Sequence, residues 1–166
     1  MNEQNPYGSP EAVVADLADT SLAGRGERLG AAIIDTILLL VILIPLMFVG
    51  GYWQVAMSGS GEIPFGTALL WAAIGFAAFV AVQWFPLNAN GQTWGKRLLG
   101  IRIVDMDGAK PPIGRLIGLR YLPVQVATNV PLVGMVLALV NVLLIFRGDR
   151  RCGHDLIAGT QVVKGS

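Results

Sequence analysis

The sequence predicts an all-α integral membrane protein with a small cytoplasmic β element. Of its 166 residues, 54% are hydrophobic and only 14% are charged, whereas soluble domains average about 25% charged residues. The chain also contains apolar runs long enough to cross a hydrocarbon core of about 30 Å at about 1.5 Å per residue. We therefore expect one membrane domain over residues 23–164, preceded by a flexible cytoplasmic tail over residues 1–22.

Two long apolar runs predict the first two membrane helices. The first helix covers about residues 26–49 and the second about residues 65–87. Trp71 and Trp84 lie near the two ends of the second helix, and amphipathic rings favour the headgroup region of a bilayer. The connecting residues 50–64 contain no lysine or arginine, which is typical of a loop on the outer side of the membrane.

The third apolar block, residues 121–146, is broken by polar residues and prolines near 128–131. A single crossing would place the basic residues that follow it outside, whereas an even number of crossings keeps every basic flank inside. We therefore expect a third helix at about 113–127 and a fourth at about 131–146. Because both are short, they form either two crossings or a re-entrant hairpin. The predicted location is the bacterial inner membrane, with both termini cytoplasmic.

Two short segments favour strands over helices. Residues 100–105 alternate apolar and polar side chains, and residues 160–163 are a second strand-like stretch. These two strands would pair into a small sheet on the basic side of the membrane.

Asp35 is the first functional candidate, because it lies inside an otherwise uncharged apolar run. A carboxylate in a bilayer core costs between about 2.5 and more than 10 kcal/mol, so a partner, water or a proton must offset the charge. Arg28 lies about 10.5 Å away along the helix axis, too far for a comfortable ion pair. Partners from elsewhere are more plausible, namely Arg120, Arg115, Arg97, Lys96 or His154. Either the pair is structural, or Asp35 exchanges a proton for a cation.

The adjacent residues His154 and Asp155 also have two interpretations. The pair could relay protons at the cytoplasmic mouth, or Asp155 could cap a short helix and form a salt bridge. With a single cysteine, Cys152, and no Cys/His cluster, the sequence predicts no metal site and no cofactor. It also lacks a nucleophile–base arrangement, so we do not expect an enzyme.

The segment 91–97 contains a Gly-Lys pair, as a phosphate-binding Walker A loop does. That motif also needs glycine at position 90 and serine or threonine at position 97, where this chain has Asn and Arg. Lys96 and Arg97 are instead expected to contact anionic lipid headgroups. The predicted partners are therefore the lipid bilayer and further copies of the chain. No nucleic-acid partner is expected.

Three ordered motifs resemble the RDD family of membrane proteins. They are Arg28-Leu-Gly-Ala-Ala-Ile-Ile-Asp35, the segment 91–108, and the closing segment 154–163. The family is named for one arginine and two aspartates, and the resemblance places these at Arg28, Asp35 and Asp155. It implies a membrane domain over most of the chain, and transport of unidentified ligands, with cation–proton exchange proposed for some members.

We therefore expect a small inner-membrane transporter of cations or other small solutes, with Asp35 as the proton- or cation-binding group. Arg28, Asp155, His154 and Arg120 are the supporting charged residues. Four short helices enclose little volume, so a permeation path would need a homo-oligomer. The alternative is a non-catalytic membrane scaffold, or an assembly or regulatory partner, in which the arginine and the two aspartates are structural.

Overall fold

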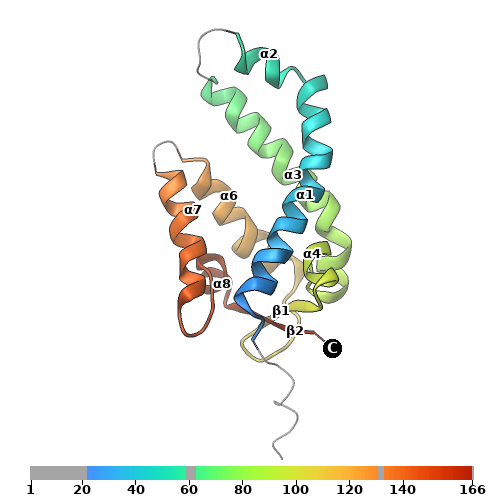
Figure 1. The fold of residues 1–166 in the computed structure, drawn as a ribbon, viewed down its shortest axis with the longest axis vertical. Helices are drawn as coiled ribbons and strands as arrows, with labels where there is room; N and C mark the ends of the chain where they lie inside the picture. The colour runs from blue at the N-terminus through green and yellow to red at the C-terminus, as the bar shows by residue number, and fades with distance from the viewer. Residues whose placement is uncertain (1–21, 59–62, 131–132, 166) are drawn as a thin grey trace, which may run out of the picture.

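The computed structural model describes residues 22–58, 63–130 and 133–165. The predicted tail, apart from Leu22, lies outside the described residues. The described chain is mostly helical, with one small sheet at the end of the molecule where the first helix begins (Figure 1).

Two long helices run along the molecule, α1 (Arg25–Val49) and α3 (Phe65–Asn90). Within the described residues, only these two helices have both the length and the hydropathy of a membrane span. The prediction of two long membrane helices is confirmed to that extent. A short helix, α2 (Tyr52–Ala56), follows α1 at the far end. There, Tyr52 packs edge-on against Trp71 of α3, with ring centroids 5.5 Å apart, as expected for an aromatic belt.

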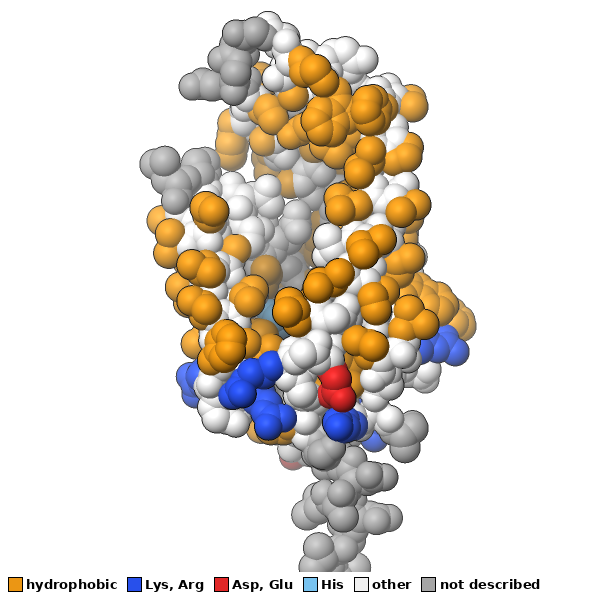
Figure 2. Space-filling model, in the orientation of Figure 1, with side chains coloured by type: hydrophobic (Ala, Val, Ile, Leu, Met, Phe, Trp, Pro, Cys, Tyr) orange, Lys and Arg blue, Asp and Glu red, His pale blue; other side chains and the backbone are white. Residues whose placement is uncertain are grey.

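The side chains on the surface are sorted along the length of these helices. Large apolar side chains cover the upper part of the face seen in Figure 2, whereas lysines and arginines gather at its lower end. The sequence accounts for this sorting, because residues 29–95 contain no lysine or arginine. The apolar surface suits lipid, and the basic end suits water and headgroups.

The third apolar block folds into two short helical segments, as the sequence predicts. The first consists of α5 (Ile113–Arg115), a π-helical turn η2 (Leu116–Tyr121) and α6 (Leu122–Thr128). The second consists of α7 (Gly134–Leu143) and a 3₁₀ turn η3 (Leu144–Phe146). The helices α6 and α7 lie side by side (Figure 1). Neither reaches the length of a spanning helix.

The π-helical turn has a local cause in the sequence. Pro123 lies in the first turn of α6 and has no N–H to donate to the carbonyl of Leu119, so the α-helical ladder lacks a bond there. The wider turn contains Arg120, whose side chain is 1% exposed.

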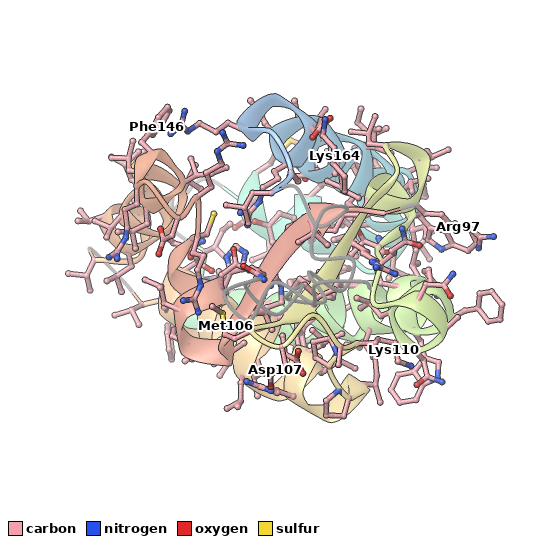
Figure 3. All side chains as sticks on the ribbon, turned by 90° about the horizontal axis from the view of Figure 1, so that it is seen from below. Arg97, Met106, Asp107, Lys110, Phe146 and Lys164 are labelled. Atoms are coloured by element: carbon pink, nitrogen blue, oxygen red, sulfur yellow. The ribbon has the colours of Figure 1, made fainter. Side chains whose placement is uncertain are left out.

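The predicted strand pair is also confirmed. Strand β1 (Ile101–Asp105) pairs antiparallel with β2 (Thr160–Lys164), with Ile103 opposite Val162. The inward side chains of this sheet join Leu87 and Leu116 in the buried core. Figure 3 views this end of the molecule from below, where the sheet lies near the centre. The two remaining short helices, α4 (Trp94–Leu98) and α8 (Gly153–Ala158), precede β1 and β2 respectively.

Candidate functional site

Asp155 is the centre of a buried ion cluster at the basic end. It lies in the first turn of α8, where its Oδ2 accepts a hydrogen bond from the backbone N–H of Cys152 (3.1 Å). Arg28 donates to Oδ2 and Arg120 to Oδ1, so both guanidinium groups share one carboxylate. The hydroxyl of Thr160 also donates to Oδ1 (3.2 Å). Asp155 is fully buried, and both arginines are less than a tenth exposed.

This geometry matches the capping and salt-bridging interpretation of Asp155. Burial by itself raises the pKa of a carboxyl group, but the charges of Arg120 and Arg28 outweigh it and hold the pKa of Asp155 well below its usual range. Asp155 is therefore ionised at every ordinary pH. Its ligand atom lies within 4.8 Å of those of Cys152 and His154, but the two guanidinium groups repel a metal cation at this position.

Asp35 has no cationic partner among the described residues. The expectation that Arg120, Arg115, Arg97, Lys96 or His154 would pair with it is wrong. Its Oδ1 instead accepts hydrogen bonds from the side-chain amide of Gln83 (2.9 Å) and the backbone N–H of Gly95 (2.8 Å), and its Oδ2 accepts one from the hydroxyl of Thr93. Neutral donors from α3 and from the start of α4 therefore replace the expected charge.

The orientation of each donor around Asp35 is fixed by a second hydrogen bond. Gln83 presents its amide N–H to Asp35 because its Oε1 already accepts from the backbone N–H of Trp94 (2.9 Å). Thr93 is the N-cap of α4 and accepts from the N–H of Lys96 (3.3 Å), which leaves its own proton for Asp35. All three groups around Asp35 donate hydrogen bonds to it. Donors bind an anion such as a carboxylate and do not coordinate a cation.

Two glycines bring α4 close enough to α1 for these contacts. Gly91 ends α3 in the left-handed region, with φ of 65°, and turns the chain back. Gly95 lies so close to α1 that a Cβ there would overlap the carbonyl oxygen of Ala31 and approach Cγ of Asp35 to 3.0 Å. The sequence predicted only headgroup contacts of Lys96 and Arg97 for this segment, and it did not predict the contacts of Thr93 and Gly95 with Asp35. A glutamine near the end of an apolar helix is the one signal that pointed to a buried polar partner.

His154 is held by Asn141 of α7. The Oδ1 of Asn141 lies 3.0 Å from the backbone N of His154 and 3.1 Å from its Nδ1, so the ring donates from Nδ1. Burial, followed by the charge of Arg120, lowers the pKa of His154 to about 3. The ring is therefore neutral near pH 7, and its Nε2, 3.7 Å from Oδ2 of Asp155, forms no ion pair.

The lowered pKa of His154 predicts a pH-dependent stability. Below pH 6.5 the unfolded chain binds a proton at this ring, whereas the folded chain does not until about pH 3. The unfolding free energy should therefore fall as the pH falls below 6.5, by up to about 1.4 kcal/mol per pH unit. Thermal melting in detergent between pH 7 and pH 4.5 measures this slope. A His154→Asn variant keeps a donor toward Asn141 and should flatten the slope, whereas equal slopes in both proteins would rule out this cause.

The remaining sequence candidates lie near these clusters without joining them. Arg115 donates to the carbonyl of Ala158 (2.7 Å). Arg97 is exposed, with its guanidinium carbon 5.5 Å from the ring of Trp94. Lys96 is partly buried, and burial together with the charge of Arg120 lowers its pKa to about 8.

Comparisons with known proteins agree with the motifs. The model of the RDD family matches residues 22–159. An uncharacterized protein of Bacillus subtilis, YckC, is 32% identical over 142 residues, which cover 84% of this chain and 83% of that protein. An uncharacterized protein of Haemophilus influenzae is 29% identical over 92 residues, covering 55% of this chain and 56% of that protein. No solved structure matches the chain.

Proposed function

The chain belongs to the RDD family, and we propose that it is a non-catalytic membrane scaffold in which the arginine and the two aspartates hold the domain together. In this function the protein presents a fixed membrane domain to a partner whose assembly or regulation it supports. Arg28, Asp35 and Asp155 then hold separate segments of the chain together and do not bind a transported ion.

One observation carries this proposal: each of the two carboxylates is surrounded by donors that come from separate parts of the chain. Asp35 joins α1 to α3 and α4, and Asp155 joins α8 to α1 and η2. A transport carboxylate has to release its partners in each cycle. Removing one partner from a buried pair costs about 3–5 kcal/mol, which makes Asp155 in particular a poor exchange site.

We place this scaffold in the bacterial inner membrane, with four membrane-embedded segments and both termini cytoplasmic. The gathering of lysines and arginines at one end of the molecule (Figure 2) supports this orientation, because basic residues favour the cytoplasmic side. The segments containing α6 and α7 would enter the membrane from that side and return to it.

The second candidate is a proton-coupled transporter of cations or other small solutes that uses Asp35. The observation that favours it is the contact between Asp35 and the hydroxyl of Thr93. A hydroxyl can donate or accept, so Asp35 could gain a proton by reversing this bond without moving the helices. This candidate needs a homo-oligomer to supply a continuous path.

Two substitutions at Asp35 separate these functions. In Asp35→Asn, the amide oxygen can still accept from Gln83 and Gly95, and the new NH₂ group can donate to Thr93. In Asp35→Ala, three donors lose their acceptor, at about 1–3 kcal/mol for each buried group left unpaired.

If the protein is a scaffold, Asp35→Asn should melt within a few degrees of the wild type, and Asp35→Ala should be strongly destabilised. Proteoliposomes of the wild type should then show no pH-driven Na⁺ or K⁺ flux above that of empty liposomes. Flux in the wild type that disappears in a normally folded Asp35→Asn protein would overturn the scaffold function and establish the transporter.

A further inference from the structure

A cavity of about 310 Å³ opens at the basic end of the molecule beside the Asp155 cluster, which contributes Arg28, Arg120 and His154 to its lining. Its polar wall comes from four different elements and consists of Arg25, Arg28, Lys96, Arg120 and His154. The volume lies at the lower end of the range of small-molecule sites, about 300–1,000 Å³.

The charge of this wall is strongly unbalanced. Four of its side chains are positively charged, and His154 is neutral near pH 7. Within the described residues, the only carboxylate in ion-pair contact with the wall is that of Asp155, which pairs with Arg28 and Arg120. An excess of positive charge in a partly enclosed space attracts an anion.

Two polar groups in this wall have no partner among the described residues. The ammonium group of Lys96 makes no ion pair with an acidic side chain and donates no hydrogen bond. The Nε of Arg120, in a side chain only 1% exposed, also lacks an acceptor. Buried donors are almost always satisfied in folded proteins, so Nε of Arg120 points to an acceptor that binds from outside the chain. The unpaired ammonium group of Lys96, in a partly buried side chain of the same wall, adds a positive charge for an anionic acceptor.

The rest of the cavity lining is largely apolar. Leu29, Val142, Ile145 and Phe146 contribute to it, and the guanidinium of Arg25 lies over the ring of Phe146, 5.6 Å from its centroid. In the view from below, Phe146 lies at the edge of the molecule, on the opposite side from Arg97 (Figure 3). The cavity therefore combines a cationic wall with an apolar one near the first turn of α1, at the level where headgroups would surround the protein.

We propose that this cavity is a binding site for a phosphate group, with Lys96 as its main unpaired ligand and Arg25 and Arg120 beside it. The phosphate belongs either to an anionic phospholipid, whose chains would lie along the apolar wall, or to a small soluble phosphate. Phosphate binding here does not depend on whether the domain is a scaffold or a transporter, because neither function uses Lys96.

A pair of neighbouring substitutions tests the site. Lys96→Gln removes the cavity charge, whereas Arg97→Gln removes an equal charge from the exposed side of the same helix. The full-length protein in dodecyl maltoside micelles is titrated with inorganic phosphate, with phosphatidylglycerol, and with phosphatidylcholine as the zwitterionic control. The increase in melting temperature reports binding, since a ligand of the folded state stabilises it.

We expect Lys96→Gln to weaken binding at least tenfold and Arg97→Gln to weaken it by no more than about threefold. Lys96→Arg keeps the charge and should restore binding. Binding of inorganic phosphate identifies a soluble ligand, and binding of phosphatidylglycerol alone identifies a lipid. Equal losses in the Gln variants at 96 and 97, or no response of the wild type to either anion, would overturn the proposal.

A measurement on the wild-type sequence keeps the test valid even if Lys96→Gln does not fold. The chain has three lysines, Lys96, Lys110 and Lys164, so reductive ¹³C-methylation gives three lysine NMR signals besides that of the N-terminal amine, and Lys110→Arg and Lys164→Arg assign them. Without ligand, Lys96 should titrate near its lowered pKa of about 8. A bound phosphate should raise the pKa of Lys96 by a unit or more and leave the other two lysines unchanged. An unchanged pKa of Lys96 at saturating ligand would contradict the site.

Discussion

An Asp155→Asn variant is expected to lose about 3–5 kcal/mol of stability. Asp155 is fully buried and is the shared counter-ion of Arg28 and Arg120. An amide supplies one acceptor oxygen and no charge, so two buried guanidinium groups would be left without a neutralising partner. The melting temperature in detergent and the monodisperse fraction on gel filtration measure the loss.

Asp149→Asn is the matched control for this prediction. Asp149 also pairs with an arginine, since its Oδ1 lies 3.3 Å from Nε of Arg147, but its side chain is 37% exposed. Exposed pairs contribute about 0–1 kcal/mol, so this variant should melt close to the wild type. Equal melting temperatures for the two variants would mean that the buried cluster does not hold α8 to the rest of the domain.

Gly95→Ala is expected to cost about 3 kcal/mol or more, although it adds a single methyl group. The new Cβ would overlap the backbone carbonyl of Ala31, which cannot rotate away as a side chain can. Helix α4 must therefore move off α1, and the N–H of Gly95 and the hydroxyl of Thr93 then withdraw from Asp35. Overpacking and the lost hydrogen bonds of the partly buried carboxylate add in the same direction.

Gly66→Ala provides the comparison, since a Cβ at Gly66 of α3 meets no atom within 4 Å. Alanine favours a helix over glycine by up to about 1 kcal/mol, so this variant should be neutral or slightly stabilised. Thermal melting of both variants in the same detergent measures the difference. A Gly95→Ala protein as stable as Gly66→Ala would show that the close approach of α4 and α1 is not needed for the fold.

Features that depend on local sequence were predictable. The long apolar runs gave both spanning candidates to within a few residues, and the alternation in residues 100–105 gave a strand that does pair with the closing segment. The division of the third apolar block also followed from sequence, because charge bias and chain breaks agreed. Hydropathy and periodicity are properties of neighbouring residues, so the three-dimensional fold is not needed to see them.

The partners of the two aspartates were not predictable in the same way. A buried carboxylate suggested a positively charged partner, but neutral donors satisfy Asp35, and Gln83 and Thr93 carry no charge to mark them. Arg28 proved to be the partner of Asp155, which depends on how α8 is placed against α1. Contacts between residues so far apart in the chain follow from tertiary structure, which composition and spacing do not encode.

Lys96 and Arg97 illustrate a second limit. They are adjacent, equally charged, and were expected to act together at headgroups. In the structure Lys96 lines the cavity and Arg97 lies outside it. Consecutive residues of a helix point in different directions, but the start of α4 has to be known before the inward residue can be chosen, and that start depends on Thr93 and Gly95.

The residues of the Asp155 cluster are synthesised at very different times. Arg28 leaves the ribosome 127 residues before its counter-ion, and Arg120 leaves it 35 residues before. Both arginines must therefore remain solvated, or paired with another group, until Asp155 has been synthesised. A nascent chain that stops short of Gly153 lacks Asp155, and it therefore leaves both arginines without the counter-ion that they share in the folded domain.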